Sequence, residues 1–214
     1  MKFCSKHRLH LISDEIFACS VFPGDANAVD FTSVFSVDAD QYIDPDYLHV
    51  SYGFSKSFGA AGLNVGSVVT RNSQLIEAFS KATQFTTLSG ANIATARAVF
   101  GDQERCRYFV NKNKENLARA HRHATDGLEK IGVRWLKGCN AGFFLWIDLS
   151  PYLPDHETPE LALAQKLVDA GVFLNPREEH GPKPGWFRFV YTQDPATVTE
   201  GLQRSVPALA LGER

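Results

Sequence analysis

The sequence predicts an α/β protein with a buried core, and three observations support this fold class. The chain has 214 residues, of which 44% are hydrophobic and 21% charged, a balance typical of a folded globular protein. Short apolar runs of strand length recur along the chain. Residues 103–131 space apolar or small side chains three or four positions apart, as one helix face requires. The length corresponds to between one and two domains.

The first predicted strand has acidic side chains at its end. Residues 9–13 form a short apolar stretch that stops at Asp14 and Glu15. In open α/β sheets, ligands bind beside the carboxyl ends of the strands, so Asp14 is a candidate functional residue. Residues 23–47 have weak periodicity and are rich in Asp, Pro, Ala and Ser, which predicts a long excursion with short elements at most.

A glycine-rich turn joins the next two predicted strands. We expect strands at residues 48–53 and 67–70, a turn over residues 55–66, and a helix over residues 73–81. The glycines of the turn could approach a phosphate, but their spacing matches neither the P-loop nor the dinucleotide-binding motif.

The C-terminal part of the chain has the pattern of a small α+β unit. The long helix of residues 103–131 should end near Gly132, and Asn113 interrupts its apolar stripe. Beyond it, the pattern predicts strands at residues 133–136, 142–149, 172–174 and 186–191, and helices at residues 158–170 and 195–209.

Charge and cysteine usage exclude several function classes. The 22 Lys and Arg against 24 Asp and Glu leave a net charge of −2, which provides no basic field for nucleic acid or an anionic membrane. The four cysteines form no Cys-x-x-Cys pair, and we find no Cys/His/Asp cluster with metal-ligand spacing, so we expect reduced thiols and no metal site. The first twenty residues lack the apolar core of a signal peptide, and no run approaches a membrane span; we therefore expect a cytoplasmic protein.

Three side chains could carry chemistry. Lys56 follows a predicted strand within Ser-Lys-Ser-x-Gly, where small neighbours would let its amine reach a carbonyl, although a lysine in such a turn is usually only solvated. Asp14 could be a helix cap, a structural ion-pair partner or a functional carboxylate. Arg188 interrupts an apolar strand, and its guanidinium fork suits either a ligand carboxylate or an internal acid.

The order of these segments resembles a known enzyme family. Three segments, in this order, resemble the pyridoxal-phosphate (PLP) aminotransferases of class I/II and fold type I. They are Ile12-Ser13-Asp14-Glu15-Ile16-Phe17, Ser55–Gly66 and Pro184-Gly185-Trp186-Phe187-Arg188-Phe189. The branch that contains 1-aminocyclopropane-1-carboxylate synthase is the most similar, and residues 141–148 resemble its small-domain strand. The resemblance implies an α/β fold, with the C-terminal part of a large domain of mixed, mostly parallel sheet, plus a small α+β domain.

The resemblance also implies a role for each candidate. Lys56 would be the catalytic lysine that forms the Schiff base (internal aldimine) and later moves the α-proton, Asp14 would keep the pyridine nitrogen protonated, and Arg188 would bind the substrate carboxylate. Ser55, Phe17 and Asn64 occupy the other positions that contact the cofactor. These roles agree with the chemistry of each side chain.

Three positions depart from the family pattern. The arginine normally found eight residues after the lysine is Asn64, and the serine normally found three before it is Gly53. Phe17 replaces an aromatic residue that commonly carries a hydroxyl. The loss of one charge-assisted contact typically costs about 1.5–3 kcal/mol, so we expect weaker cofactor binding.

The resemblance covers only the C-terminal half of the family sequence. It implies residues 1–104 as the C-terminal part of the large PLP-binding domain, 105–132 as a connecting helix and 133–214 as the small domain. Most of the large-domain sheet would then be missing, which leaves strand edges and apolar faces exposed.

We therefore keep three hypotheses. The first is a PLP-dependent aminotransferase acting on an amino acid or 2-oxo acid, in biosynthetic or secondary metabolism; a PLP-dependent lyase that catalyses elimination shares its early steps. The family is usually homodimeric, and residues 86–90 resemble the segment that reaches the neighbouring subunit's cofactor. The second is a truncated, cofactor-poor and non-catalytic family member that needs a partner chain. The third is a module that binds a phosphate ligand through the glycine turn.

Overall fold

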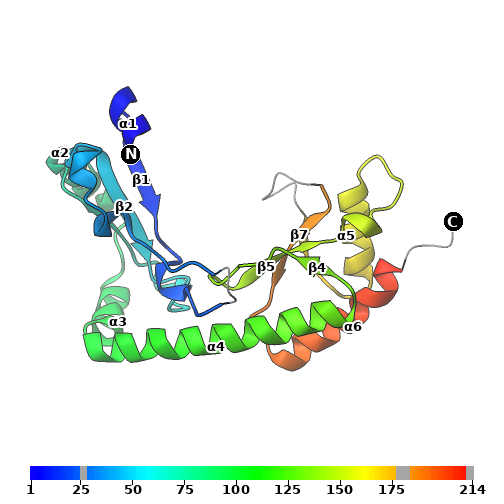
Figure 1. Ribbon diagram of the computed structural model, residues 1–214. Helices are drawn as coiled ribbons and strands as arrows, with labels where there is room; N and C mark the ends of the chain where they lie inside the picture. The colour runs from blue at the N-terminus through cyan, green and yellow to red at the C-terminus, as the bar shows by residue number, and fades with distance from the viewer. Residues whose placement is uncertain (25–27, 177–183, 211–214) are drawn as a thin grey trace. The chain divides into compact units, whose positions relative to one another are not determined.

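The computed structural model describes residues 1–24, 28–176 and 184–210, and the chain divides into two compact units (Figure 1). Unit 1 comprises residues 1–21 and 30–114, and unit 2 comprises residues 22–29 and 115–214. The boundary therefore falls inside a helix, α4 (Gln103–Lys130), whose amphipathic pattern predicts it over nearly the same range. The division into a large-domain part, a connecting helix and a small domain stays a prediction.

Unit 1 is built on a three-stranded mixed sheet in the order β1-β2-β3. β1 (Leu11–Asp14) runs parallel to β2 (Leu48–Gly53), and β3 (Gly66–Thr70) runs antiparallel to β2. Three helices follow or precede the sheet: α1 (Lys2–His7), α2 (Ser73–Ala82) and α3 (Gly90–Phe100). The sequence predicted the three strands and α2, whereas α1 and α3 were not anticipated.

Among its described residues, the excursion between β1 and β2 contains only short 3₁₀ turns, as its weak periodicity predicts. These turns cover Ala18–Ser20, Val34–Ser36, Ala39–Gln41 and Pro45–Tyr47. Ala39 and Ile43 of this segment form a small buried core with Leu48 of β2. Much of the apolar surface of unit 1 is open: Ile12 on β1 is 66% exposed and Val69 on β3 is 51% exposed.

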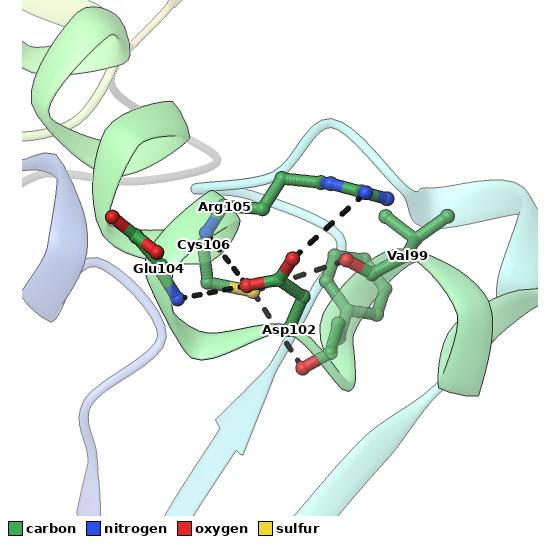
Figure 2. A network of polar contacts seen from close by, with 6 residues as sticks. Val99, Asp102, Glu104, Arg105 and Cys106 are labelled. Carbon is green, nitrogen blue, oxygen red and sulfur yellow. Dashed lines mark hydrogen bonds and ion pairs between the residues drawn. The ribbon is translucent and has the colours of Figure 1, made fainter.

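The corner between α3 and α4 is fixed by a cap (Figure 2). The Asp102 carboxylate accepts hydrogen bonds from the backbone N–H groups of Glu104 and Arg105, both at 3.0 Å. These bonds to backbone amides, that of Arg105 foremost, lower the pKa of Asp102. The Cys106 thiol donates to the carbonyl of Phe100 at 3.6 Å. The cap provides acceptors for free backbone N–H groups at the start of α4. The Cys106 bond links the first turn of α4 to Phe100 at the end of α3.

Unit 2 is an antiparallel sheet in the order β4-β5-β7-β6. Its strands are β4 (Arg134–Trp135), β5 (Phe144–Asp148), β6 (Asn175–Pro176) and β7 (Trp186–Val190). The helices α5 (Pro159–Asp169) and α6 (Pro195–Leu209) start at prolines, which are tolerated in the first turn.

The core of unit 2 lies between one face of this sheet and its helices. Leu145 and Ile147 alternate along β5 and are buried with Phe187 of β7, Leu128 of α4 and Leu163 of α5. The sheet's other face carries Trp146 and Arg188, which pair across β5 and β7. This alternation puts Arg188 away from the apolar core.

One predicted element of unit 2 is wrong. Residues 172–174 form no strand; the ladder with β7 is made instead by Asn175 and Pro176. The reason lies in the end of α5, where Gly171 has φ +79° and the N–H of Val172 bonds back to the carbonyl of Leu167. The chain is still completing the helix terminus at the position where a strand was expected.

No helix of the described residues is both long enough and apolar enough to cross a membrane.

Candidate cofactor and substrate site

Two predicted site residues come from neighbouring parallel strands. Asp14 ends β1 and lies opposite Ser51 of β2, and β2 leads within a few residues to Lys56. The N–H of Glu15 continues the pairing with the Ser51 carbonyl at 3.0 Å. Because carboxyl ends of parallel strands meet at one sheet edge, the carboxylate and the amine belong to the same edge of unit 1.

The two acidic residues at the end of β1 have different surroundings. Glu15 is buried, and its Oε1 accepts hydrogen bonds from the Ser33 hydroxyl at 3.0 Å and the Val34 N–H at 2.9 Å. Asp14 is exposed, and its Oδ1 accepts only a 3.2 Å bond from the Ile16 N–H among the bonds described. Glu15 therefore fastens the excursion, while Asp14 remains accessible to a ligand.

Lys56 sits in a turn closed by its own backbone. The Gly59 N–H donates to the Lys56 carbonyl and the Ala60 N–H donates to the Phe54 carbonyl, both at 3.1 Å. Gly59 has φ +62°, a conformation that glycine adopts without the cost of a Cβ. The Lys56 side chain is exposed, whereas that of Ser57 next to it is buried.

The positions expected near a cofactor phosphate provide neutral groups. Asn64 is exposed and left-handed (φ 52°, ψ 30°), and Ser55 is half-buried. A Cβ at Gly53 would lie 3.1 Å from Ile16 Cδ1, so a serine there would require the end of the Ile16 side chain to move by a few tenths of an ångström. Beside Asn64 lies a cavity of about 380 Å³, lined also by Gly66, Thr83, Gln84, Thr86, Thr87, Leu88 and Ile93. None of these lining residues carries a charge.

Two aromatic side chains lie near the candidates in sequence: Phe17 shortly after Asp14, and Tyr52 shortly before Lys56. Phe17 is half-buried and offers a ring without a hydroxyl; its carbonyl accepts bonds from the Ser20 N–H at 2.9 Å and hydroxyl at 2.7 Å. Tyr52 on β2 has a buried hydroxyl, and burial, with help from neighbouring Cys19, raises its pKa. The sequence did not single out Tyr52.

Arg188 lies in unit 2, on the sheet face opposite the core. Its Nη2 donates to the Asn175 Oδ1 at 3.2 Å, and its guanidinium carbon lies 5.8 Å from the Phe144 ring centre. Its Nε is buried and has no hydrogen-bond partner among the described residues. A buried donor without a partner is costly, so this guanidinium fits an added anionic acceptor such as a carboxylate.

The residues fit part of a PLP site. Asp14 and Lys56 offer an acid for a pyridine nitrogen and an amine for an aldehyde at one sheet edge. Arg188 offers a carboxylate a buried N–H that has no partner within the described part of the chain. The polar side chains that line the cavity beside Asn64 are all amides and hydroxyls. Asp14, Lys56, Ser55, Phe17 and Asn64 all belong to unit 1, and Arg188 belongs to unit 2.

Comparisons with known proteins identify the family of the chain. The family model described as aminotransferase class I and II matches residues 1–204. The human 1-aminocyclopropane-1-carboxylate synthase-like protein 1 is 32% identical over 211 residues, covering 97% of this chain and 41% of that protein. The rice (Oryza sativa subsp. japonica) 1-aminocyclopropane-1-carboxylate synthase 3 is 34% identical over 206 residues, covering 89% of this chain and 45% of that protein.

Solved structures show the same fold. A Thermus thermophilus aspartate aminotransferase double mutant superposes with a TM-score of 0.76 at 25% identity, over 96% of this chain and 50% of that one. The chain thus spans about half the length of the relatives it matches. The expected α/β fold and the expected family, whose members are PLP enzymes, are both confirmed. On this combined ground, the chain belongs to the class I and II aminotransferase family.

Proposed function

We propose that this chain contributes the lysine-bearing half of a PLP-dependent aminotransferase site that acts on an amino acid or a 2-oxo acid. The observation that carries the proposal is the placement of exposed Asp14 and Lys56 after adjacent parallel strands. The proposal includes the division of the chain into a large-domain part (1–104), a connecting helix (105–132) and a small domain (133–214).

Each side chain would have a distinct task. Lys56 would hold the cofactor through Nζ and afterwards carry the substrate α-proton on the same atom. The Asp14 carboxylate would accept a hydrogen bond from the N–H of the pyridine ring and keep that nitrogen protonated. Ser55, Asn64 and the backbone near Phe17 would contact the rest of the ring and the phosphate. Bound PLP supplies an electron sink for the substrate's α-carbon.

Arg188 would orient the substrate. Its partnerless Nε, together with the Nη2 that now donates to Asn175, presents two N–H groups on one side of a planar fork. That fork matches a carboxylate bidentately, and a charge-assisted pair of this kind fixes both position and direction.

One experiment tests the proposal at its first step. The purified chain is mixed with PLP, the visible absorption band is recorded, and the adduct is reduced with borohydride and mapped by mass spectrometry. We expect a band and a modified Lys56, and neither in Lys56→Ala. Lys81→Ala removes another exposed lysine, which pairs with Glu77 at 2.6 Å, and should keep the band. A folded chain that shows no band, either alone or after addition of the N-terminal half of a relative, contradicts the proposal.

A second candidate function has its own support. The neutral surroundings of Asn64, the close contact at Gly53 and the half-length match favour a cofactor-poor, non-catalytic family member that works beside a partner chain. Absence of the band from the folded chain alone, and its continued absence after addition of the N-terminal half of a relative, would support this alternative.

Reaction type and assembly complete the proposal. Transamination would yield a 2-oxo acid from the amino donor, whereas a lyase would release a leaving group without needing an oxo-acid acceptor, so product analysis separates them.

We also propose a cytoplasmic homodimer. Phe85 is 91% exposed immediately before residues 86–90, which places a large apolar side chain on the segment expected at an interface. Sedimentation of the wild type and Phe85→Ser tests the dimer.

A further inference from the structure

A chain of three hydrogen bonds runs from Asp14 to helix α4. The Ile16 N–H donates to the Asp14 carboxylate at 3.2 Å, and the Ser57 hydroxyl donates to the Ile16 carbonyl at 3.4 Å. The Asn113 Nδ2 then donates to the Ser57 carbonyl at 2.9 Å. All four residues belong to unit 1. The series links the carboxylate, the residue after Lys56 and the helix.

The Asn113 end of this series has the stronger geometry. Its 2.9 Å separation is that of a good N–H···O bond, whereas the Ser57 to Ile16 bond is long. Asn113 interrupts the apolar stripe of α4, and a polar side chain at such a position is costly unless it is hydrogen-bonded. The bond to Ser57 accounts for an asparagine there.

A cluster of aromatic rings packs the same turn against α3 and α4. Phe58 stacks on Phe109 of α4, with ring centres 5.5 Å apart and planes inclined by 13°. Phe54 stacks on Phe100 at the end of α3, at 4.0 Å and 14°. Asn113 follows Phe109 by one helical turn, so two neighbouring positions on one face of α4 contact consecutive residues of the turn.

We propose that Ser57 and Asn113 are positioning residues, which hold the turn of Lys56 at a fixed place relative to Asp14. This inference rests on the proposed function for its chemical meaning, because the two side chains would act on one cofactor. The residues act through Lys56 and touch no substrate. An amine anchored on one side by α4 and on the other by the Asp14 segment is pre-organised for a planar ligand that spans both.

The first test measures the turn without cofactor. Amide hydrogen exchange is followed at Gly59 and Ala60, whose N–H groups close the turn. We expect Asn113→Asp, which replaces the donor with an acceptor, to speed their exchange about fivefold or more, the factor that corresponds to one lost neutral hydrogen bond. Ser57→Ala should act in the same direction but more weakly, and Asn113→Gln, which keeps an amide donor, should restore slow exchange.

The matched control is Asn116→Ala. Asn116 is exposed on the same helix, and its side chain accepts a hydrogen bond from Arg119 at 2.6 Å. This variant should leave the exchange of Gly59 and Ala60 as in the wild type. Equal exchange in Asn113→Asp and the wild type, with both folded by circular dichroism, overturns the proposal.

The second test measures the amine itself. PLP is added, the adducts are reduced with borohydride, and labelling of Lys56 is divided by labelling of Lys81 in the same molecules. We expect this ratio to fall at least threefold in Asn113→Asp, to recover in Asn113→Gln, and to stay unchanged in Asn116→Ala. An unchanged ratio in Asn113→Asp overturns the positioning role. If the wild type itself shows no preference for Lys56, the proposed function fails, and the exchange result still decides whether Asn113 holds the turn.

Discussion

Replacing Asn64 with arginine adds a cation at the position that the proposed function places beside the cofactor phosphate. A charge-assisted hydrogen bond contributes about 1.5–3 kcal/mol, which corresponds to a roughly 10- to 150-fold gain in PLP affinity. Asn64 has φ 52°, and asparagine tolerates this left-handed conformation better than most residues. An arginine held there costs about 1 kcal/mol, which should lower the thermal midpoint by roughly 2–4 °C for a chain of this length.

The assay titrates PLP against the visible band in the wild type, Asn64→Arg and Asn64→Gln. Glutamine carries the same left-handed strain without the charge, so it should share the lower thermal midpoint but not the gain in affinity. Pyridoxal, which lacks the phosphate, should bind all three proteins alike. If Asn64→Arg leaves PLP affinity unchanged while the protein stays folded, no phosphate lies near position 64, and our placement of the cofactor is refuted.

Three further predictions concern stability. Leu128→Ala, at a fully buried position of α4, should lower the free energy of unfolding by about 2–5 kcal/mol in urea titrations, whereas Leu136→Ala, 49% exposed, should change it by less than about 0.5 kcal/mol. Burial, and after it the charge of neighbouring His10, lowers the pKa of His49, so the unfolded chain binds this proton more readily than the folded chain. The free energy of unfolding should therefore decrease as the pH drops through about 6.5. His49→Gln should flatten the dependence of the unfolding free energy on pH between about pH 7.5 and 5.5. Backbone N–H groups of α4 lower the pKa of Asp102, so the stability that its carboxylate contributes is present at neutral pH and is lost as the pH falls through that lowered pKa. Asp102→Ala should reduce the thermal midpoint at pH 7, whereas Asp102→Asn should largely retain it. Equal midpoints for the wild type and both variants would refute the cap.

Local patterns predicted much of the fold because they act over a few residues. The spacing of apolar side chains located α4 and α6, and Asp194 followed by Pro195 marked the start of α6. The excursion after β1 was recognised by its lack of periodicity. α3 was missed, although Ser89 caps it by accepting a bond from the Asn92 N–H at 3.1 Å, because its apolar residues form no clear stripe.

Contacts between distant segments could not be read from the sequence. Asn113 was visible as a break in an apolar stripe, but its partner, Ser57, lies 56 positions away. Glu15 and Asp14 were equally acidic in sequence, and only the packing of Ser33 and Val34 against Glu15 separates a structural carboxylate from an accessible one. Gly53 was a missing serine in sequence and a close contact with Ile16 in the structure.

The assignment of residues 22–29 to unit 2 has a consequence for synthesis of the chain. The Asn140 Nδ2 donates to the carbonyls of Phe22 and Val29, both at 3.1 Å, across sequence separations of 118 and 111 residues. At translation rates of about 5–20 residues per second, the early segment waits roughly 6–24 s before Asn140 emerges from the ribosome. Unit 2 therefore cannot be completed from contiguous sequence, and a fragment that begins at residue 115 would lack both acceptors.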